Sequence, residues 1–147
     1  MRLAERPLDF MSGQAASVVG ATTSQVAISN GDLDQAMRDL TGAYPTAIGT
    51  QDMPIVAAVG VSVACLADAL GRPADAAEVL GAAARLRGSP DHGDPIIRDL
   101  TDRLRTRLGA GFDCAFDRGR LLDRPGAIGR INPAVLVSPD PDPARPR

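Results

Sequence analysis

Few residue combinations in this sequence are suited to chemistry. The single histidine, His92, lies in the run Asp91-His92-Gly93-Asp94, whose oxygen and nitrogen atoms are possible metal ligands. A zinc site takes three or four converging ligands, and neither a second histidine nor a nearby cysteine completes such a set here. We therefore interpret the run as a turn, and we expect no metal and no other cofactor.

Catalytic groups are equally hard to assemble from these residues. Serine and aspartate are plentiful, but one histidine in a loop leaves no nucleophile with a fixed base beside it. The segment Gly109-Ala110-Gly111 lacks the preceding strand and the lysine of a phosphate-binding loop. The sequence thus predicts no catalytic residue, and we expect a protein that is not an enzyme.

Arginine provides the best candidates for binding. All 16 basic residues are arginine; residues 85–130 hold ten of them against seven acidic residues, whereas residues 1–84 hold four against nine. Because a guanidinium pairs well with phosphate, such a cluster is a candidate nucleic-acid surface. The candidate partner-contact residues in this cluster are Arg98, Arg105 and Arg120.

The distribution of acidic residues favours another interpretation of these arginines. Asp94 with Arg98, and Asp99 with Arg103, are pairs four residues apart on a predicted helix, each worth about 0.2–0.5 kcal/mol. A solvated helical face with internal ion pairs is therefore preferred. A module that contacts nucleic acid through the arginine-rich C-terminal half remains the alternative function.

Helices are expected to position all of these residues. A chain of 147 residues with three Phe, one Tyr and no Trp forms one domain with a core of Ala, Leu, Val and Ile. Capping residues mark the predicted helix starts. These starts are Ser12, Asp32, Thr50 or Asp52, Pro73 and Asp94, followed by short helices over about residues 110–122 and 127–131. Pro45 is expected to kink the second helix or to end it early.

The most apolar run, residues 55–70, is expected to form a buried helix. It is shorter than the roughly 20 residues that span a bilayer, and it contains Asp68, so no membrane insertion is predicted. Residues 59–63 alternate like a strand, which is the rival interpretation. The two cysteines, Cys65 and Cys114, are expected to be free thiols in a reducing cytoplasm, because no signal peptide is recognisable.

An internal repeat organises the predicted helices. Residues 31–40 align without gaps on residues 71–80, a period of 40 residues, and in both copies a glycine ends one helix just before the next begins. A helix–turn–helix unit buries its apolar face only by stacking on a neighbour. The sequence therefore predicts an all-α fold of antiparallel helix–turn–helix repeats with a C-terminal helical cap.

Three segments of the repeat region also resemble a known family. They read GDLDQA, LADALGR-x-x-DAAEVLGAAARLR and RLRTRLG-x-x-FDCAFDRGRLL, the last with Phe112, Ala115, Gly119 and Leu122 following Leu108-Gly109. These three sequence motifs are similar to the C-terminal tetratricopeptide-like region of bacterial transcription regulators of the LuxR and AfsR/SARP types. Such regulators often also carry a signalling ATPase module. The resemblance covers about residues 31–131, and it implies a regulatory helical region that contacts proteins.

This resemblance completes the expected organisation. Residues 1–11 are an N-terminal extension, residues 12–131 a tetratricopeptide-like helical domain, and residues 132–147 a disordered, proline-rich tail. The sequence lacks the phosphate loop and the DNA-reading helix-turn-helix of the larger regulators, so we expect an orphan module or the remnant of a longer gene. The expected partner is a protein rather than nucleic acid, and a homo-oligomer is left open.

Overall fold

The computed structural model describes residues 2–88 and 93–136, with side chains from Ala15 onward. All regular secondary structure in the described residues is helical, and none of it is strand. Residues 59–63, for which a strand was the rival interpretation, lie within a helix. The all-α fold predicted from the sequence is confirmed. In chain order the elements are α1 (Arg2–Ser29), α2 (Leu33–Thr50), α3 (Met53–Ala69), α4 (Pro73–Arg87), α5 (Pro95–Leu108), α6 (Gly111–Arg120), α7 (Arg124–Arg130) and the 3-10 helix η1 (Pro133–Leu136).

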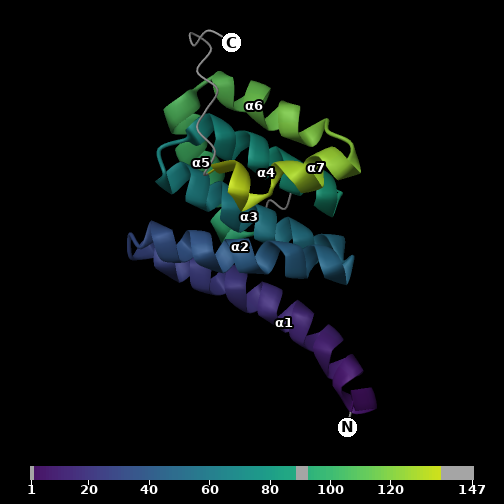
Figure 1. Ribbon diagram of the computed structural model, residues 1–147. Coiled ribbons are helices and arrows are strands. Elements are labelled where there is room, and N and C mark those ends of the chain that lie inside the picture. Colours follow the sequence, from purple (N-terminus) through teal and green to yellow (C-terminus); the bar gives the residue numbers. More distant parts are fainter. Residues whose placement is uncertain (1, 89–92, 137–147) are drawn as a thin grey trace, which may run out of the picture.

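The 40-residue repeat corresponds to two helix pairs, α1 with α2 and α3 with α4 (Figure 1). Gly31 and Gly71 have φ angles of +80° and +79°, a left-handed conformation that glycine adopts without strain. In both turns the residue after the glycine donates its N–H to a carbonyl five residues upstream, at 2.8 and 2.9 Å. The two turns are therefore the same C-terminal motif, which reverses the chain in the same way.

The repeat also places equivalent small residues in the core. Ala36 and Ala76 are completely buried, and Leu40 and Leu80, one turn later, are buried as well. An alanine in the first turn lets the neighbouring helix come close, and the leucine then fills the space next to it. The two copies thus use the same positions to pack α2 and α4.

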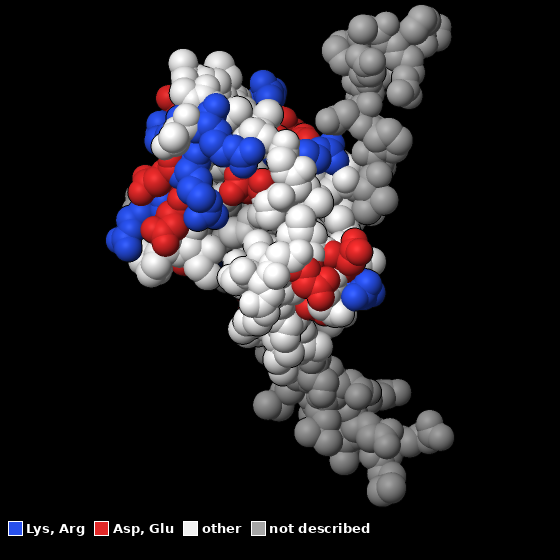
Figure 2. Space-filling model, turned by 90° about the vertical axis from the view of Figure 1, so that its left-hand side faces the viewer, with Lys and Arg blue, Asp and Glu red and all other residues white. Residues whose placement is uncertain are grey.

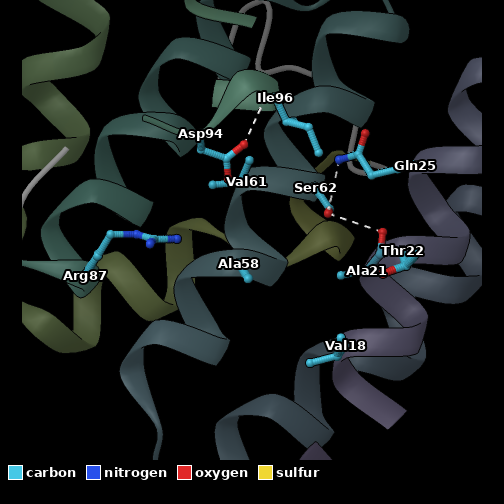
Figure 3. Close-up of a pocket in the computed structure, with 10 residues that line it drawn as sticks. All are labelled: Val18, Ala21, Thr22, Gln25, Ala58, Val61, Ser62, Arg87, Asp94 and Ile96. Atoms are coloured by element: carbon cyan, nitrogen blue, oxygen red, sulfur yellow. Dashed lines mark hydrogen bonds between the residues drawn. The ribbon is translucent and has the colours of Figure 1, made fainter. Parts of the chain in front are cut away.

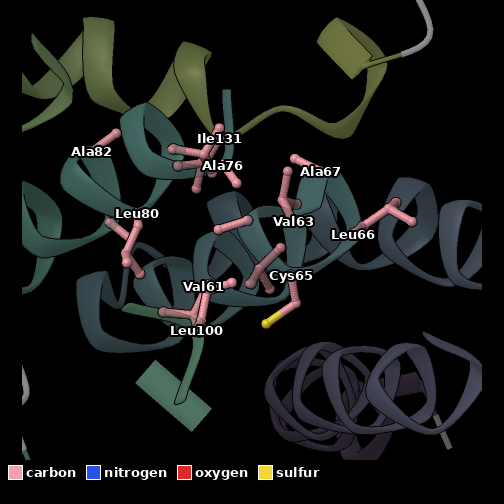
Figure 4. Close-up of a cluster of buried hydrophobic side chains, with 14 of the residues drawn as sticks. Val61, Val63, Cys65, Leu66, Ala67, Ala76, Leu80, Ala82, Leu100 and Ile131 are labelled. Carbon is pink, nitrogen blue, oxygen red and sulfur yellow. The ribbon is translucent and has the colours of Figure 1, made fainter. Parts of the chain in front are cut away.

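Helix α3 contributes many of the buried core side chains, among them Val61, Val63 and Cys65 (Figure 4). It packs against α1, α2, α4 and α5, and nearly all of its residues from Val56 to Ala67 are buried. A helix that is covered on every side must be apolar around its whole circumference. This explains why residues 55–70 form the most apolar run of the chain.

Aspartate caps start four of the helices. The side chain of Asp32 accepts from the Gln35 N–H at 3.1 Å, and Asp52, Asp94 and Asp123 cap α3, α5 and α7 in the same way. The predicted starts at Asp32, Asp52 and Asp94 are thus confirmed. Thr50, the other candidate, is instead the last residue of α2.

Helix α1 does not begin at Ser12. It begins at Arg2, and residues 2–11 continue the same helix rather than forming a separate extension. Most of these residues are types with high helix propensity, such as Leu3, Ala4 and Glu5. Because of this propensity the helix already begins ten residues before Ser12, which the sequence pattern had marked as its N-cap.

Pro45 does not end α2, which continues for five more residues to Thr50. The proline ring is exposed, so solvent can reach the Thr41 carbonyl that loses its helical partner. Ala43 and Ala47, on either side of Pro45, are buried against neighbouring helices. This packing holds the last turn of α2 in helical form despite the proline.

The predicted disorder from residue 132 onward is wrong for residues 132–136. Pro133 and Leu136 are buried in the 3-10 helix η1, and the Asn132 side chain accepts from the Ala134 N–H at 3.0 Å. Arg72 Nη1 also donates to the Leu136 carbonyl at 2.7 Å. These contacts anchor the segment to the helical body. The remaining part of the predicted tail, residues 137–147, lies outside the described residues.

Helices α4 and α6 cross through glycines that leave no room for a side chain. A Cβ atom built on Gly81 would overlap the Phe116 carbonyl, and one built on Gly119 would overlap the Glu78 carbonyl and lie 2.7 Å from the Ala82 nitrogen. The atoms that block both positions are backbone, which cannot move aside independently. The crossing therefore requires glycine on both helices.

We predict that Gly119→Ala lowers the free energy of unfolding by about 1–3 kcal/mol, because the added methyl group forces α6 away from α4. The matched control is Gly42→Ala in α2, where a Cβ meets nothing within 4 Å. This control should raise stability by about 0.5–1 kcal/mol through helix propensity. Urea denaturation of both variants measures the effect, and a Gly119→Ala protein as stable as its parent would contradict the tight crossing.

Candidate functional site

A groove between α1, α3 and α5 is the candidate site for binding a partner. Its volume is about 250 Å³. Small and aliphatic side chains form most of its surface, and two charged residues stand at one end (Figure 3). The residues that line it, called the α1–α3–α5 groove below, are Val18, Ala21, Thr22, Gln25, Ala58, Val61, Ser62, Arg87, Asp94 and Ile96.

A polar bridge at one side of the groove links α1 to α3. Gln25 Nε2 donates to Ser62 Oγ at 3.2 Å, and Ser62 Oγ donates to the Ala21 carbonyl at 3.5 Å (Figure 3). Ser62 is almost completely buried, so this bridge gives its hydroxyl the partners that burial requires. The Ser62 hydroxyl therefore has a structural role between the two helices.

The remaining surface of the α1–α3–α5 groove is suited to apolar side chains. Val18 on α1 and Ile96 on α5 are exposed, and Ala58 and Val61 lie between them on α3. Figure 2 shows a broad uncharged area on one face of the molecule, next to a face where basic and acidic side chains are interleaved. The lining contains hydroxyl groups but no histidine or cysteine, so these residues form no nucleophile–base pair. A ligand can therefore be held there mainly by apolar contacts and by the shape of the groove.

The three candidate arginines do not form one site. Arg98 and Arg105 lie on α5 and Arg120 lies on α6, and no hydrogen bond or ion pair joins any two of them within the described residues. Arg105 Nη1 lies 3.4 Å from Asp113, and Arg120 Nη2 lies 3.3 Å from Asp117. Arg98 has no ion pair with another described residue.

The aromatic residues near these arginines belong to the core. Phe112 is buried, and its ring stacks on the half-buried Phe116 ring with centroids 5.6 Å apart. The Arg105 guanidinium covers the Phe112 ring, 4.5 Å from its centroid, in a cation–π contact. Both phenylalanines pack inward, so they do not offer a platform for stacking nucleic-acid bases.

Other arginines form ion pairs between helices rather than within them. Asp68 on α3 is nearly buried and accepts from Arg103 at 3.2 Å and from Arg107 at 2.6 Å, both on α5. The predicted pairing of Arg103 with Asp99 is therefore replaced by a contact between two helices. A pattern of residues four apart cannot reveal such a contact, because Asp68 is 35 residues from Arg103.

A second cluster of ion pairs joins α4, α6 and α7. Arg130 donates to Glu78 at 2.6 Å and to Asp75 at 2.9 Å, while Arg118 donates to Glu78 at 3.1 Å and Arg72 to Asp75 at 2.7 Å. Burial of Glu78 by itself raises the pKa of its carboxyl group. The hydrogen bonds and charges of Arg130 and Arg118 outweigh that effect and lower this pKa below its usual value.

Metal and thiol chemistry receive little support from the described residues. They contain no group of three or more His, Cys, Asp or Glu side chains placed to hold a metal ion, and His92 lies outside them. Both cysteines are free, Cys65 buried and Cys114 exposed. Burial raises the pKa of the Cys65 thiol, which keeps it protonated and unreactive.

None of the helices in the described ranges combines the length and apolarity needed to cross a membrane.

Comparisons of this chain with family models, with curated proteins and with solved structures find no significant match. The similarity to bacterial transcription regulators therefore rests on its sequence motifs alone.

The residues that line the α1–α3–α5 groove were not predicted from the sequence. One signal could have pointed to them, because residues 12–29 form a helical stretch without a single charged side chain.

We predict that Glu78→Gln lowers the free energy of unfolding at neutral pH by about 1–3 kcal/mol, because two charge-assisted hydrogen bonds are weakened. A carboxyl group whose pKa is lowered by folding stabilises the protein above its unfolded pKa of about 4.3. That stabilisation disappears as the pH falls through the lower folded pKa. The difference between variant and parent should therefore shrink below about pH 4.

The control for this experiment is Asp113→Asn, which removes an exposed pair with Arg105. Exposed pairs contribute little, so the loss should stay under about 1 kcal/mol. Urea denaturation at a series of pH values measures both variants. An equal loss for Glu78→Gln at neutral and acidic pH would show that the charge of Glu78 does not stabilise the α4–α6–α7 junction.

Proposed function

We propose that this chain is a non-catalytic helical module that binds a protein partner, and that it acts in the cytoplasm as part of a bacterial transcription-regulatory system. The observation that carries the proposal is the α1–α3–α5 groove, a recess with exposed aliphatic side chains on two of its walls. The regulatory context comes from the sequence motifs of residues 31–131.

The energetics of the groove favour a protein ligand. Burying one aliphatic side chain contributes about 1.5–3 kcal/mol, whereas association itself costs several kcal/mol. A partner must therefore insert more than one apolar side chain, as a helix does when its residues three and four apart share a face. The charged end at Arg87 and Asp94 gives the ligand a polar contact that fixes its direction.

The alternative, nucleic-acid binding, is favoured by one observation: Arg98 forms no ion pair within the described residues 15–88 and 93–136. Most of the nearby arginines donate to carboxylates, which reduces the positive field they project. We therefore expect any binding to DNA to be weak and to be lost at modest salt. The two functions differ in which side chains they require, so variants can separate them.

The first test replaces Arg98, Arg105 and Arg120 by Gln and titrates DNA binding with salt. The parent and the triple variant should bind duplex DNA equally weakly. A nucleic-acid surface would instead bind near physiological salt, with a log–log slope of about −0.9 for each phosphate contacted. Tight binding by the parent that the triple variant loses would establish the alternative function and remove the proposed one.

The second test replaces Ile96 by Asp. This residue is 43% exposed at the second position of α5, where an acidic side chain is compatible with the helix dipole, so the fold should be retained. A genomic two-hybrid screen against the parent chain identifies partners, and each is then measured by calorimetry against purified variants. Ile96→Asp should weaken binding by at least about tenfold.

The matched control is Leu121→Asp, which changes another exposed aliphatic residue, 73% exposed and outside the groove lining. It should leave the affinity unchanged. Partners that bind the parent and Ile96→Asp equally well, or a screen that gives none, would count against the groove as the binding site.

A further inference from the structure

The α1–α3–α5 groove is small for the kind of partner proposed above. Its volume of about 250 Å³ lies below the roughly 300–1,000 Å³ of typical ligand pockets. A helix that inserts more than one aliphatic side chain needs more room than this. One wall of the groove must therefore move outward when such a partner binds.

Helix α5 is the wall with the least support from the core. Two of its 14 residues, Leu100 and Leu104, are buried, whereas eleven of the 17 residues of α3 are buried. Helix α1 packs along α2, and the Gln25–Ser62 bridge ties it to α3. Elements with few buried apolar contacts open at the lowest cost in free energy. Opening of the groove should therefore begin with α5.

A cluster of ion pairs in the second half of α5 holds this helix on α3. Arg103 Nε donates to Asp68 Oδ2 at 3.2 Å. Arg107 Nη1 donates to Asp68 Oδ1 at 2.6 Å and to the Asp68 carbonyl oxygen at 3.2 Å. We call these three residues the α5 latch. The same two helices form the groove, where Ile96 of α5 and Val61 of α3 each lie seven residues before a member of the latch.

The α5 latch combines a fixed end with a movable one. The side chain of Asp68 is 10% exposed, whereas those of Arg103 and Arg107 are 54% and 44% exposed. The arginines can therefore move into water with their helix while Asp68 stays in place on α3. Gly109, which follows α5, has a φ angle of +57° and open space at its Cβ position, so the chain can rotate there.

We propose that α5 is the movable wall of the α1–α3–α5 groove and that the α5 latch holds it closed, so that Asp68 controls how often the groove opens. In the open state α5 lifts from α3 and widens the groove for a partner. The role in partner binding rests on the proposed function. The opening itself is a property of the free protein, so it can be measured without any partner.

Cys65 is a native probe for this opening. It is 5% exposed on α3, and Figure 4 shows its sulfur on the same side of α3 as Leu100 of α5. The test uses the full chain with Cys114→Ser, which removes the exposed thiol. The rate at which the neutral disulfide dithiodipyridine modifies Cys65 then reports the population in which α5 is lifted.

Asp68→Asn should raise the rate of Cys65 modification at least about tenfold, because one partner of a nearly buried ion pair is lost. Arg103→Gln combined with Arg107→Gln should raise this rate to a similar extent. All three changes together should add little more, because they break the same contact. The rate should depend only weakly on urea, as expected for an opening that exposes one helix rather than the whole chain.

The two kinds of latch variant separate opening from a direct effect on the thiol. Burial is the main cause that raises the pKa of the Cys65 thiol, but Arg103 also lowers this pKa and Asp68 also raises it. A change in the thiol alone would therefore alter the modification rate in opposite directions in the two kinds of variant. Opening of α5 accelerates the reaction in both.

The matched control is Glu78→Gln, which weakens the α4–α6–α7 junction instead of the latch. It should leave the rate of Cys65 modification in the absence of urea unchanged. Latch variants that leave this rate unchanged or shift it in opposite directions would overturn the proposal, as would an equal acceleration by Glu78→Gln. Loss of partner binding in Ile96→Asp would be unaffected by that failure, so the proposed function would still stand.

Discussion

The close approach of α4 and α6 is the constraint on which the rest of the structure depends. Gly81 and Gly119 let the two helices meet backbone to backbone, and each faces a carbonyl of the other helix. No side chain separates them, so Arg118 on α6 reaches Glu78 on α4, where Arg130 of α7 also binds. The position of the C-terminal cap therefore follows from the absence of two side chains.

Electrostatics then divides the molecule into two kinds of surface. The arginine-rich half forms ion pairs between helices, with Asp68 holding two arginines of α5 and Glu78 two arginines from different helices. These contacts occupy guanidinium groups that would otherwise attract phosphate. The charge-free part of α1 leaves aliphatic side chains exposed instead. Recognition by apolar contact is thus favoured on one side of the molecule, while charge mainly stabilises the other.

The shape and the polar end of the α1–α3–α5 groove limit the kind of ligand that it can hold. The α1–α3–α5 groove is recessed and has a polar end at Arg87 and Asp94, which favours a segment that inserts in one direction.

The sequence by itself determined the helices and their turns, because these depend on contacts between residues that are close in the chain. The glycines at 31 and 71, the caps at Asp32, Asp52 and Asp94, and the apolar run of α3 all act locally. Only the tertiary structure decided that α2 continues past Pro45 and that Pro133 and Leu136 are buried. It also decided that Arg103 pairs with Asp68 rather than Asp99 and that the groove forms. Each of these outcomes depends on atoms far apart in the sequence, whose distance is set by packing and cannot be derived from spacing.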